Sequence, residues 1–454
     1  FAKILRSPEA AAMIRTLFVN MQDLNKGARR PTNVPPTNIK KIGVVGAGFM
    51  GAGIAQVSAA AGLSVVLIDR DQESADKGKG HAKSVIDDLI AKGRAKETER
   101  DAILSRITAT ADYNALKDCD LIIEAVFEDR KVKAETYAKA QPLLKDGAIF
   151  ASNTSTLPIN SLAEEFKDQG KFIGIHFFSP VEKMMLVEII VGKNTGDVAL
   201  ATALDYTRMI GKTPIVVNDS RGFYANRCVG RYIAEGNEMF LEGVPPAMIE
   251  NTAKMAGMPV GPLSLSDEVA LDLGLKVMKA TEADLGPNAI NPDQKKLMVE
   301  MVEKQGRLGR KNSKGFYDYP EKGKGQKSLW PGLGALQPKY LDPDTLDVEE
   351  LKQRFLVVQA VEAARTVEDH VITDMREADV GSILGFGFAP FTGGTLSYID
   401  FMGTKKFVEL CHKLEAKYGS RFTPPKLLVE MAAKGETFYG RFPPKKQSAA
   451  QAAE

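Results

Sequence analysis

The chain has 454 residues, of which 44% are hydrophobic and 26% charged. This length and composition are typical of a globular protein with roughly two to four domains. The 60 Lys and Arg residues nearly balance the 58 Asp and Glu residues, so the net charge of +2 creates no broad positive field for nucleic acid or anionic lipid. No apolar run approaches the ~20 residues needed to cross a bilayer. We therefore expect no nucleic-acid partner and no integral membrane segment.

The three cysteines are far apart in the sequence. Cys119, Cys228 and Cys411 show no CxxC spacing, which argues against a disulfide framework and against a thiolate metal site. We expect no bound metal, and a reducing location such as the bacterial cytoplasm or an organelle matrix. The chain begins with Phe1 rather than Met, so we expect it to be part of a longer protein.

The first residues predict an amphipathic helix followed by a linker. Ser7-Pro8-Glu9 combines a capping hydroxyl, a proline suited to the first helical position and an acid that complements the helix dipole. Apolar residues then recur at helical spacing and predict a buried stripe: Met13, Ile14, Leu17, Phe18, Met21 and Leu24. Gly27 ends this helix, and the proline-bearing stretch from Arg29 to Asn38 completes a first segment over residues 1–38.

Residues 39–219 alternate short apolar runs with helical stretches, which is typical of an α/β fold with a doubly wound parallel sheet. The predicted strands are Ile42–Val45, Leu63–Ile68, Leu121–Val126, Ile149–Ser152, Phe172–Phe178, Val187–Val191 and Pro214–Val217. Their continuous apolar character indicates strands that are covered on both faces. This segment is predicted to be a Rossmann-like domain.

After Asp219 the chain is predicted to be mainly α-helical. We expect a first helical domain over residues 220–320, a connector over 321–348, a second helical domain over 349–442 and a disordered tail over 443–454. The segments Arg227–Asp267 and Arg354–Asp400 resemble each other, because each has a helix, a charged turn and a glycine-rich bend at similar offsets. The two helical domains are therefore predicted to be a tandem repeat.

A glycine-rich turn joins the first predicted strand to the next helix. Gly46-Ala47-Gly48-Phe49-Met50-Gly51 has the GxGxxG spacing, in which the glycines permit a tight turn, a close approach to pyrophosphate and close packing of the helix on the strand. Asp69 ends the second strand, where a carboxylate accepts adenine-ribose hydroxyls and repels a 2′-phosphate, although the adjacent Arg70 could accommodate that group. We expect NAD as the cofactor, bound by Gly46, Gly48, Phe49, Met50, Gly51 and Asp69.

One of the four histidines stands where catalysis is expected. His176 ends the predicted strand from Phe172, at the edge of a parallel sheet that opens on the cofactor crevice. Most histidines are structural, but Glu188 interrupts the apolar run Leu186–Ile190, and a buried carboxylate is costly unless it is paired. An imidazole with a carboxylate on its second nitrogen has a fixed tautomer and suits a general base.

Three longer segments of the sequence resemble the 3-hydroxyacyl-CoA dehydrogenase family. They are Ala151-Ser-Asn-Thr-Ser-Thr-Leu-Pro-Ile, His176-Phe-Phe-Ser-Pro-Val-Glu-Lys-Met-Met-Leu-Val-Glu-Ile-Ile and Gly211-Lys-Thr-Pro-Ile-Val-Val-Asn-Asp-Ser-Arg-Gly-Phe-Tyr-Ala-Asn-Arg. The resemblance runs from about Lys40 to Pro320, and the second helical domain extends it to about residue 440. It implies NAD-dependent oxidation of L-3-hydroxyacyl-CoA to 3-ketoacyl-CoA in fatty-acid β-oxidation.

The tandem helical domains and the first helix also resemble multifunctional β-oxidation enzymes, such as the α-subunit of the bacterial fatty-acid oxidation complex. This resemblance implies that residues 1–38 are the remnant of a preceding domain. The expected partners are an acyl-CoA substrate, an enoyl-CoA hydratase domain in the same natural chain and a thiolase subunit. The second helical domain is expected to take the place of a dimer partner.

The resemblance also implies roles for individual residues. His176 would be the base and Glu188 its orienting partner, while Ser155 and Asn226 would bind the reacting end of the substrate. Ser155 would also lie near the nicotinamide. In the absence of such roles, Ser155 would cap a helix and Asn226 would satisfy backbone groups.

Further residues are implied to contact the cofactor. Glu128 and Lys133 match positions that contact the nicotinamide ribose, although they could instead form an exposed helical ion pair. Ser179 stands where many relatives have Asn, and its shorter side chain must reach the cofactor. Lysines from Lys77 to Lys83 are candidates for the CoA phosphates, or they form a solvated helix face.

Two other functions are consistent with parts of this sequence. A dehydrogenase for a small β-hydroxy acid would use a lysine base, which the His176 and Glu188 pattern disfavours. A binding or structural protein could keep the dehydrogenase fold without turnover, because fold alone does not establish function.

Overall fold

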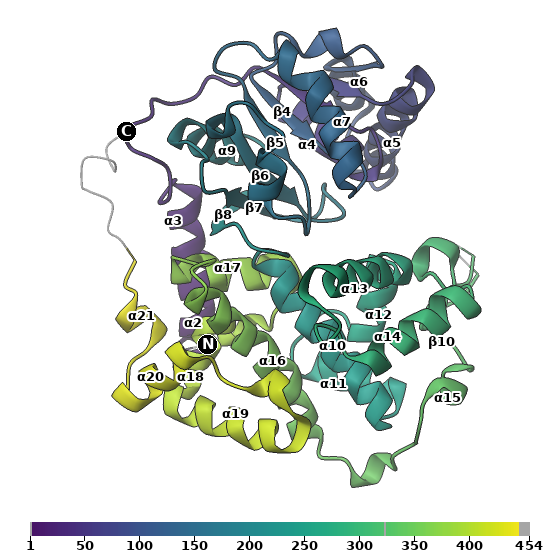
Figure 1. Cartoon of the computed structure of the whole chain (residues 1–454), viewed down its shortest axis with the longest axis vertical. Coiled ribbons are helices and arrows are strands. Elements are labelled where there is room, and N and C mark those ends of the chain that lie inside the picture. Colours follow the sequence, from purple (N-terminus) through teal and green to yellow (C-terminus); the bar gives the residue numbers. More distant parts are fainter. Residues whose placement is uncertain (1, 322–323, 445–454) are drawn as a thin grey trace. The chain divides into compact units, whose positions relative to one another are not determined.

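A computed structural model describes residues 2–321 and 324–444, and the chain forms two compact units (Figure 1). The first, which we call the sheet unit, contains the residues up to Asn226, Thr366–Phe386 and the segment that starts at Phe438. The second, which we call the helical unit, contains Arg227–Arg365 and Gly387–Thr437. The predicted tail over 443–454 lies outside the described residues from position 445 onward.

The sheet unit is built on an eight-stranded sheet with strand order β3-β2-β1-β4-β5-β6-β7-β8. The strands are β1 (Lys41–Val45), β2 (Ser64–Ile68), β3 (Ile107–Thr110), β4 (Leu121–Glu124), β5 (Ile149–Ser152), β6 (Phe172–Phe177), β7 (Leu186–Val191) and β8 (Thr213–Asn218). Apolar residues on most of these strands are fully buried, as expected for a sheet that is covered on both faces. The Rossmann-like α/β fold is therefore confirmed.

Two details of the sheet differ from the prediction. β6 and β7 are antiparallel, whereas the sequence predicted a parallel sheet. Residues 178–185 are the whole connection between them, which is too short for the crossover that parallel neighbours need. The edge strand β3 was not predicted, because Ile107 is its only buried residue and the strand lacks an apolar run.

Helices cover the sheet and follow the strands in alternation. They are α4 (Phe49–Ala60), α5 (Gln72–Ala91), α6 (Glu97–Ser105), α7 (Arg130–Ala140), α8 (Ile159–Ala163) and α9 (Asp197–Met209), with 3₁₀ turns at Tyr113–Leu116, Gln141–Leu143 and Gln169–Lys171. α4 starts within the glycine-rich segment, at Phe49. Asp71 caps α5 and Asp129 caps α7, because each side chain accepts a hydrogen bond from a backbone N–H of the first turn.

The first helical segment packs within the sheet unit through a face that the sequence did not predict. It consists of α1 (Ala2–Leu5), α2 (Pro8–Ile14), a π-helical stretch (Arg15–Asn20) and α3 (Met21–Asn25). Ser7 caps α2 by accepting a hydrogen bond from the N–H of Ala10 at 3.2 Å, as predicted.

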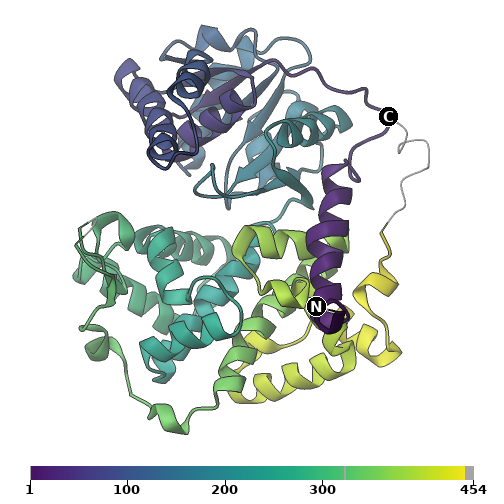
Figure 2. The ribbon, with the colours of Figure 1, turned by 180° about the vertical axis from the view of Figure 1, so that it is seen from behind.

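Three of the six residues in the predicted apolar stripe of this segment are exposed, and Leu24 is buried as predicted. The buried residues are Ala12, Thr16, Asn20 and Leu24, whereas Met13, Ile14 and Phe18 are exposed. Between Arg15 and Asn20 the wider turns of the π-helical stretch change which residues face inward, and this accounts for the exposed Phe18. The buried face contacts α17 (Met375–Phe386) and β8. The first helical segment and α17 lie next to each other in both views (Figures 1 and 2).

The helical unit contains most of the chain after Asn226. Its elements are α10 (Ala225–Glu242, which begins in the sheet unit), α11 (Pro246–Met255), α12 (Pro262–Val269), α13 (Leu271–Leu285), α14 (Pro292–Val299), α15 (Leu333–Leu336), α16 (Val348–Glu368, which ends in the sheet unit), α18 (Thr395–Met402), α19 (Thr404–Tyr418) and α20 (Lys426–Lys434). A short hairpin of β9 (Tyr317–Asp318) and β10 (Ser328–Leu329) completes it, and α21 (Phe438–Arg441) belongs to the sheet unit. The predicted helical character is confirmed.

Reciprocal contacts support a tandem repeat within the helical unit. Arg227 on α10 pairs with Glu362 on α16 at 2.8 Å, and Arg354 on α16 pairs with Glu235 on α10 at 2.6 Å. In both segments the arginine precedes the glutamate by the same number of residues. When residue i of one copy meets j of the other and j meets i, the two copies are related by a twofold axis, as in a symmetric dimer.

The glycine-rich bends that follow the paired helices repeat this pattern. A Cβ at Gly257 would lie 2.8 Å from Cβ of Ala389, and one at Gly387 would lie 2.5 Å from Cγ of Pro259. Each bend therefore contacts the residue two positions after the glycine in the other bend.

None of the helices in the described part of the chain combines the length and apolar character needed to cross a lipid bilayer.

Candidate active site

The predicted cofactor loop lies at the carboxyl edge of the sheet, between β1 and α4. Gly46 has φ of 102°, and a Cβ there would lie 2.5 Å from the carbonyl oxygen of Ala125. A Cβ at Gly51 would lie 1.7 Å from the carbonyl oxygen of Gly46. In contrast, no atom lies within 4 Å of a Cβ placed at Gly48. Two glycines are therefore required by the fold, and the third borders open space where a pyrophosphate can approach the backbone.

The start of α4 is suited to a negatively charged ligand. Gly48 is its N-cap residue and offers no side chain to the first N–H groups, which are left for a ligand. Phe49 is 54% exposed beside this turn, and its ring lies 5.1 Å from that of His81. Met50 is partly buried against the core. The residues present thus fit the diphosphate of a dinucleotide.

Asp69 stands at the end of β2 and is held by two backbone groups. Its Oδ2 accepts from the N–H of Ala47 at 2.7 Å, and its Oδ1 accepts from the N–H of Arg70 at 2.7 Å. Each carboxylate oxygen keeps a second lone pair for a ribose hydroxyl. The side chain of Arg70 is 81% exposed and pairs with Asp71 at 3.0 Å. This arrangement favours a cofactor with a free 2′-hydroxyl, as in NAD.

The structure brings the predicted base and its acid together. His176 and Glu188 are direct register partners on β6 and β7, and Nδ1 of His176 lies 2.8 Å from Oε2 of Glu188. His176 is 5% exposed and Glu188 is fully buried. The other oxygen of Glu188 accepts hydrogen bonds from the backbone N–H groups of Tyr224 at 3.1 Å and Ala225 at 2.9 Å. One carboxylate therefore orients the imidazole and anchors the first turn of α10.

Ser155 and Asn226 also lie together. The side-chain amide of Asn226 donates to the carbonyl oxygen of Ser155 at 2.7 Å. Ser155 does not cap the following helix, because the N-cap residue of α8 is Pro158. The loop that carries Ser155 is also tied to β6, since the N–H of Phe177 donates to Oδ1 of Asn153 at 2.9 Å. The candidate substrate-binding groups are therefore fixed next to the strand that carries His176.

Glu128 holds the Ser155 loop. Its Oε1 accepts from the hydroxyl of Thr154 at 2.6 Å and from the backbone N–H groups of Ser155 at 2.9 Å and Thr156 at 3.1 Å. Burial acts to raise the pKa of Glu128, but the charge of Lys133 and these hydrogen bonds outweigh it, so the pKa lies below its usual value. Glu128 is therefore an anion that clamps the loop.

Lys133 is buried, so the alternative of an exposed ion pair is wrong. Its side chain is 1% exposed, and Nζ lies 2.7 Å from Oε1 of Glu124 and 3.3 Å from Oε2 of Glu128. In this structure Lys133 meets two carboxylates, and its contact with the cofactor stays a prediction. Ser179 is exposed in the loop between β6 and β7, and its contact with the cofactor also stays a prediction.

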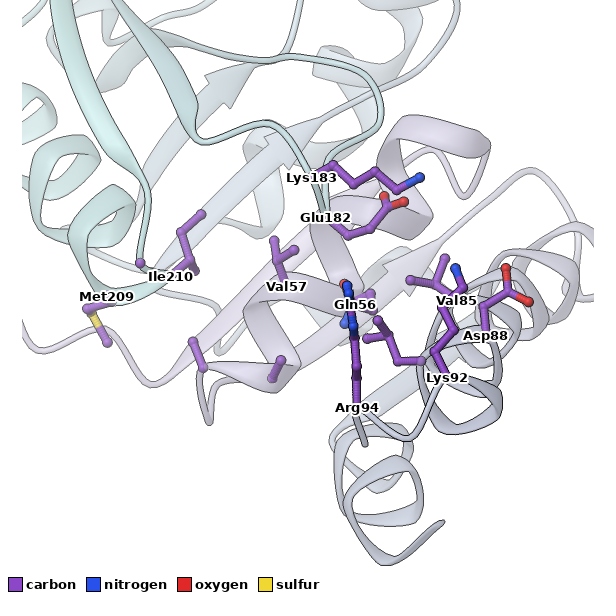
Figure 3. Close-up of a pocket in the computed structure, with 14 residues that line it drawn as sticks. Gln56, Val57, Val85, Asp88, Lys92, Arg94, Glu182, Lys183, Met209 and Ile210 are labelled. Carbon is purple, nitrogen blue, oxygen red and sulfur yellow. The ribbon is translucent and has the colours of Figure 1, made fainter. Parts of the chain in front are cut away.

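A pocket of about 730 Å³ lies in the sheet unit beyond the glycine-rich turn (Figure 3). It is lined by the later turns of α4 and α5, by the loop between β6 and β7 and by the turn before β8. Lys92, Arg94 and Lys183 give it three basic groups, against the two acidic groups of Asp88 and Glu182. None of these three basic side chains forms an ion pair within the described residues.

Gln56 lies in the middle of this pocket (Figure 3). It is 7% exposed, and its Oε1 is buried without a hydrogen-bond partner among the described residues. A buried acceptor without a partner is costly, so a donor from a ligand would stabilise it. The lysines predicted to meet CoA phosphates form exposed ion pairs along α5, Lys77 with Glu73 and Lys83 with Asp87, and their contact with CoA stays a prediction.

Sequence reasoning missed three parts of this site. Glu124 ends the apolar run of β4, which is the same signal that revealed Glu188. Asn153 follows β5 directly and could have been found as a polar residue at a strand end. The pocket residues come from four separate segments, so no local pattern could have predicted them.

The fold, the glycine-rich loop with Asp69 and the paired imidazole define an NAD-dependent oxidoreductase. The model for the 3-hydroxyacyl-CoA dehydrogenase NAD-binding domain matches residues 41–220, and the model for the C-terminal domain of the same family matches residues 222–319. The chain belongs to the 3-hydroxyacyl-CoA dehydrogenase family.

Solved structures agree with this assignment. The chain is 37% identical to (S)-3-hydroxybutyryl-CoA dehydrogenase from Ralstonia eutropha, with a TM-score of 0.58, over 63% of this chain and 100% of that one. It is 25% identical to the dehydrogenase part of multifunctional enzyme 1 from C. elegans, with a TM-score of 0.65, over 91% and 96% of the two chains. The fold of 3-hydroxybutyryl-CoA dehydrogenase from Escherichia coli K12 also matches, with a TM-score of 0.73 at 23% identity over 88% and 99%.

Proposed function

We propose that this protein oxidises L-3-hydroxyacyl-CoA to 3-ketoacyl-CoA with NAD, and that His176 is the general base. The observation that carries the proposal is the 2.8 Å contact between His176 and the buried Glu188 at the sheet edge that bears the cofactor loop. Oxidation of an alcohol removes a proton from oxygen and a hydride from carbon. The site must therefore hold a base beside a hydride acceptor.

His176 is set up to take the hydroxyl proton at Nε2. Glu188 accepts the hydrogen on Nδ1, which fixes the neutral tautomer and leaves the lone pair of Nε2 available. When the substrate proton arrives, the carboxylate stabilises the imidazolium that forms. NAD, when bound, supplies the hydride acceptor. In the reverse direction His176 returns the same proton to the ketone oxygen.

Ser155 and Asn226 orient the substrate in this proposal. Their mutual hydrogen bond and the clamp by Glu128 keep the Ser155 hydroxyl in one region, so little freedom is lost when the substrate oxygen binds. Glu128, Lys133 and Ser179 are proposed to support the nicotinamide side of the cofactor. Phe49 and Met50 are proposed to border its diphosphate, together with the three glycines of the loop.

The pocket beyond the glycine-rich turn is proposed to hold part of the CoA group. Three basic side chains suit its phosphates, and the unpartnered acceptor of Gln56 suits an N–H group of the ligand. The loop that carries Lys183 also follows β6, the strand of His176. The pocket and the base are therefore linked by a few residues of chain.

The biological setting is also a proposal. We propose a place in fatty-acid β-oxidation, with a hydratase domain in the natural chain and a thiolase partner. The match to the dehydrogenase part of a multifunctional enzyme supports the proposal that the natural chain carries a further activity. We propose a location in the bacterial cytoplasm or an organelle matrix. The reciprocal pairs of the helical unit support the proposal that the second helical repeat replaces a dimer partner.

The test follows NADH absorbance with 3-ketoacyl-CoA substrates of increasing chain length. Turnover with acetoacetyl-CoA or a longer thioester, and none with 3-hydroxyisobutyrate and NAD, is the expected result. Turnover of the free acid alone would assign a β-hydroxyacid dehydrogenase, and NADH binding without turnover of any substrate would assign a binding protein. Acetoacetyl-N-acetylcysteamine, which lacks the nucleotide, tests the pocket. Lys92→Glu should raise KM for acetoacetyl-CoA and leave KM for this truncated thioester unchanged.

A further inference from the structure

Glu124 is a fully buried carboxylate at the end of β4 that the proposed reaction does not use. It accepts four hydrogen bonds. Oε1 receives the N–H of Val126 at 2.8 Å and Nζ of Lys133 at 2.7 Å, and Oε2 receives the hydroxyls of Tyr137 at 3.0 Å and Ser152 at 2.7 Å. The rest of β4 is apolar. A buried charge with this many partners costs more than an apolar side chain would, so a purely structural role explains it poorly.

Two routes lead from Glu124 to the Ser155 loop. In the first, Lys133 lies between Glu124 and Glu128, and Glu128 accepts the backbone N–H of Ser155 at 2.9 Å. In the second, Ser152 donates to Glu124, and its oxygen accepts the N–H of Thr154 at 3.3 Å. The first route therefore ends at Ser155 and the second at the preceding residue, Thr154.

The charges along the first route set where Glu128 lies. Lys133 is shared between two carboxylates, with the shorter contact of 2.7 Å to Glu124 and the longer of 3.3 Å to Glu128. If Glu124 were neutral, the ammonium would keep one anionic partner and be drawn toward Glu128. Glu128 would then move relative to the Ser155 loop. In a buried network these attractions are strong, because little water screens them.

We propose that Glu124 is a positioning residue that acts through Lys133 and Glu128 to place the Ser155 hydroxyl for the reaction. This inference rests on the proposed function, since it assumes that Ser155 binds the reacting oxygen. Glu124 touches neither substrate nor cofactor in this arrangement. It contributes to the reaction by fixing the position of the Ser155 loop.

The first variant is Glu124→Gln, which keeps the shape of the side chain. Its carbonyl oxygen can still accept from Val126 and Lys133, and its amide group can donate to Tyr137 and Ser152, whose hydroxyls can turn to accept. kcat for acetoacetyl-CoA should fall by about tenfold to a hundredfold, as for small misplacements in other enzymes, while KM for NADH changes by less than about threefold. The deuterium isotope effect with 4-deuterated NADH should rise, because hydride transfer becomes slower.

A double-mutant cycle separates positioning from structural damage. In the Ser155→Ala background, Glu124→Gln should lower kcat by less than about twofold, because the group it places is already absent. If the two losses multiply, Glu124 does not act through Ser155 and the proposal is wrong. Tyr206→Phe is the control, since it breaks a buried hydrogen bond of 2.7 Å to Ser58 elsewhere in the sheet unit. It should lower Tm and leave kcat and the isotope effect unchanged.

Hydrogen exchange tests the same inference without any turnover. The amides of Ser155 and Thr156, which donate to Glu128, should exchange about tenfold faster in Glu124→Gln and at the parent rate in Tyr206→Phe. Unchanged exchange at these amides would overturn the proposal even if the enzyme is active. If the parent protein turns over no hydroxyacyl-CoA, the proposed function fails, and the exchange result still decides the positioning claim. Should Glu124→Gln not fold, Glu124→Gln combined with Lys133→Met removes both buried charges. The amides of Ser155 and Thr156 should again exchange about tenfold faster than in the parent, and KM for NADH should rise, because Lys133 is itself proposed to support the cofactor.

Discussion

Replacing Glu188 by glutamine is expected to reverse the proton arrangement on His176. The two backbone N–H groups of Tyr224 and Ala225 donate to Oε1 of Glu188. In the variant, the carbonyl oxygen of glutamine must face these donors, because its amide group has no acceptor to offer them. The amide group then faces Nδ1 of His176 and donates to it. The imidazole proton moves to Nε2, which is the atom that should receive the substrate proton.

The size of the effect follows from the loss of the base. A wrong tautomer and a lost carboxylate charge together remove general base catalysis, which contributes about 10²–10⁴ in rate. This corresponds to about 2.7–5.5 kcal/mol in activation free energy. Glutamine keeps the three contacts of Glu188 in altered form, so the first turn of α10 should stay in place. The glycine-rich loop and Asp69 are untouched, and NADH binding should remain.

The assay measures kcat and KM for NADH and acetoacetyl-CoA in parent and Glu188→Gln proteins, with thermal unfolding beside it. We expect kcat to fall by about 10²–10⁴, with KM for NADH within about threefold and Tm close to the parent value. A kcat within about tenfold of the parent would refute the reasoning, because a histidine in the wrong tautomer cannot act as the base. A large fall in Tm would instead indicate that the glutamine is not accommodated.

Three further predictions address the cofactor site and the stability of the fold. Gly48→Ala should fold normally and bind NADH at least about tenfold more weakly. Gly51→Ala should lower Tm, because its Cβ would lie 1.7 Å from the carbonyl oxygen of Gly46. Equal Tm values for the two variants would contradict this prediction. Asp69→Ala should raise KM for NAD and allow turnover with NADP, and unchanged cofactor kinetics would exclude its role. Burial raises the pKa of the Glu377 carboxyl from 4.5 to about 7, so the folded state holds this proton more tightly than the unfolded state. The parent protein should therefore lose roughly 3 kcal/mol of unfolding free energy as the pH rises from 4.5 to about 7. Glu377→Gln should lack this loss, and parallel unfolding free energies of both proteins from about pH 5 to about pH 8 would argue against it.

The sequence predicted the parts of the site that depend on local pattern. The GxGxxG spacing has a steric cause in the turn itself, and Glu188 stands out because a charge inside an apolar strand needs a partner. The same logic applied to Glu124 would have revealed the buried network below the Ser155 loop. The partner of that carboxylate, Lys133, could not be known, because a lysine near a helix start is usually exposed.

Long-range packing decided the features that the sequence could not predict. The exposed stripe of the first helix depends on the π-helical stretch and on the position of α17, a segment more than 300 residues later. The direction of β7 depends on the short loop before it, and not on its own residues. The repeat was visible in the sequence, but the pairing of Arg227 with Glu362 and of Arg354 with Glu235 depends on how the two helices pack in the folded chain.

The central claim is that a histidine held by a buried acid takes the substrate proton beside bound NAD. The most direct measurement compares NADH binding and single-turnover reduction of acetoacetyl-CoA in the parent and in His176→Ala. We expect the dissociation constant of NADH to stay within about threefold while the turnover rate falls by at least about 10². Turnover within about tenfold of the parent, with NADH binding retained, would contradict the account.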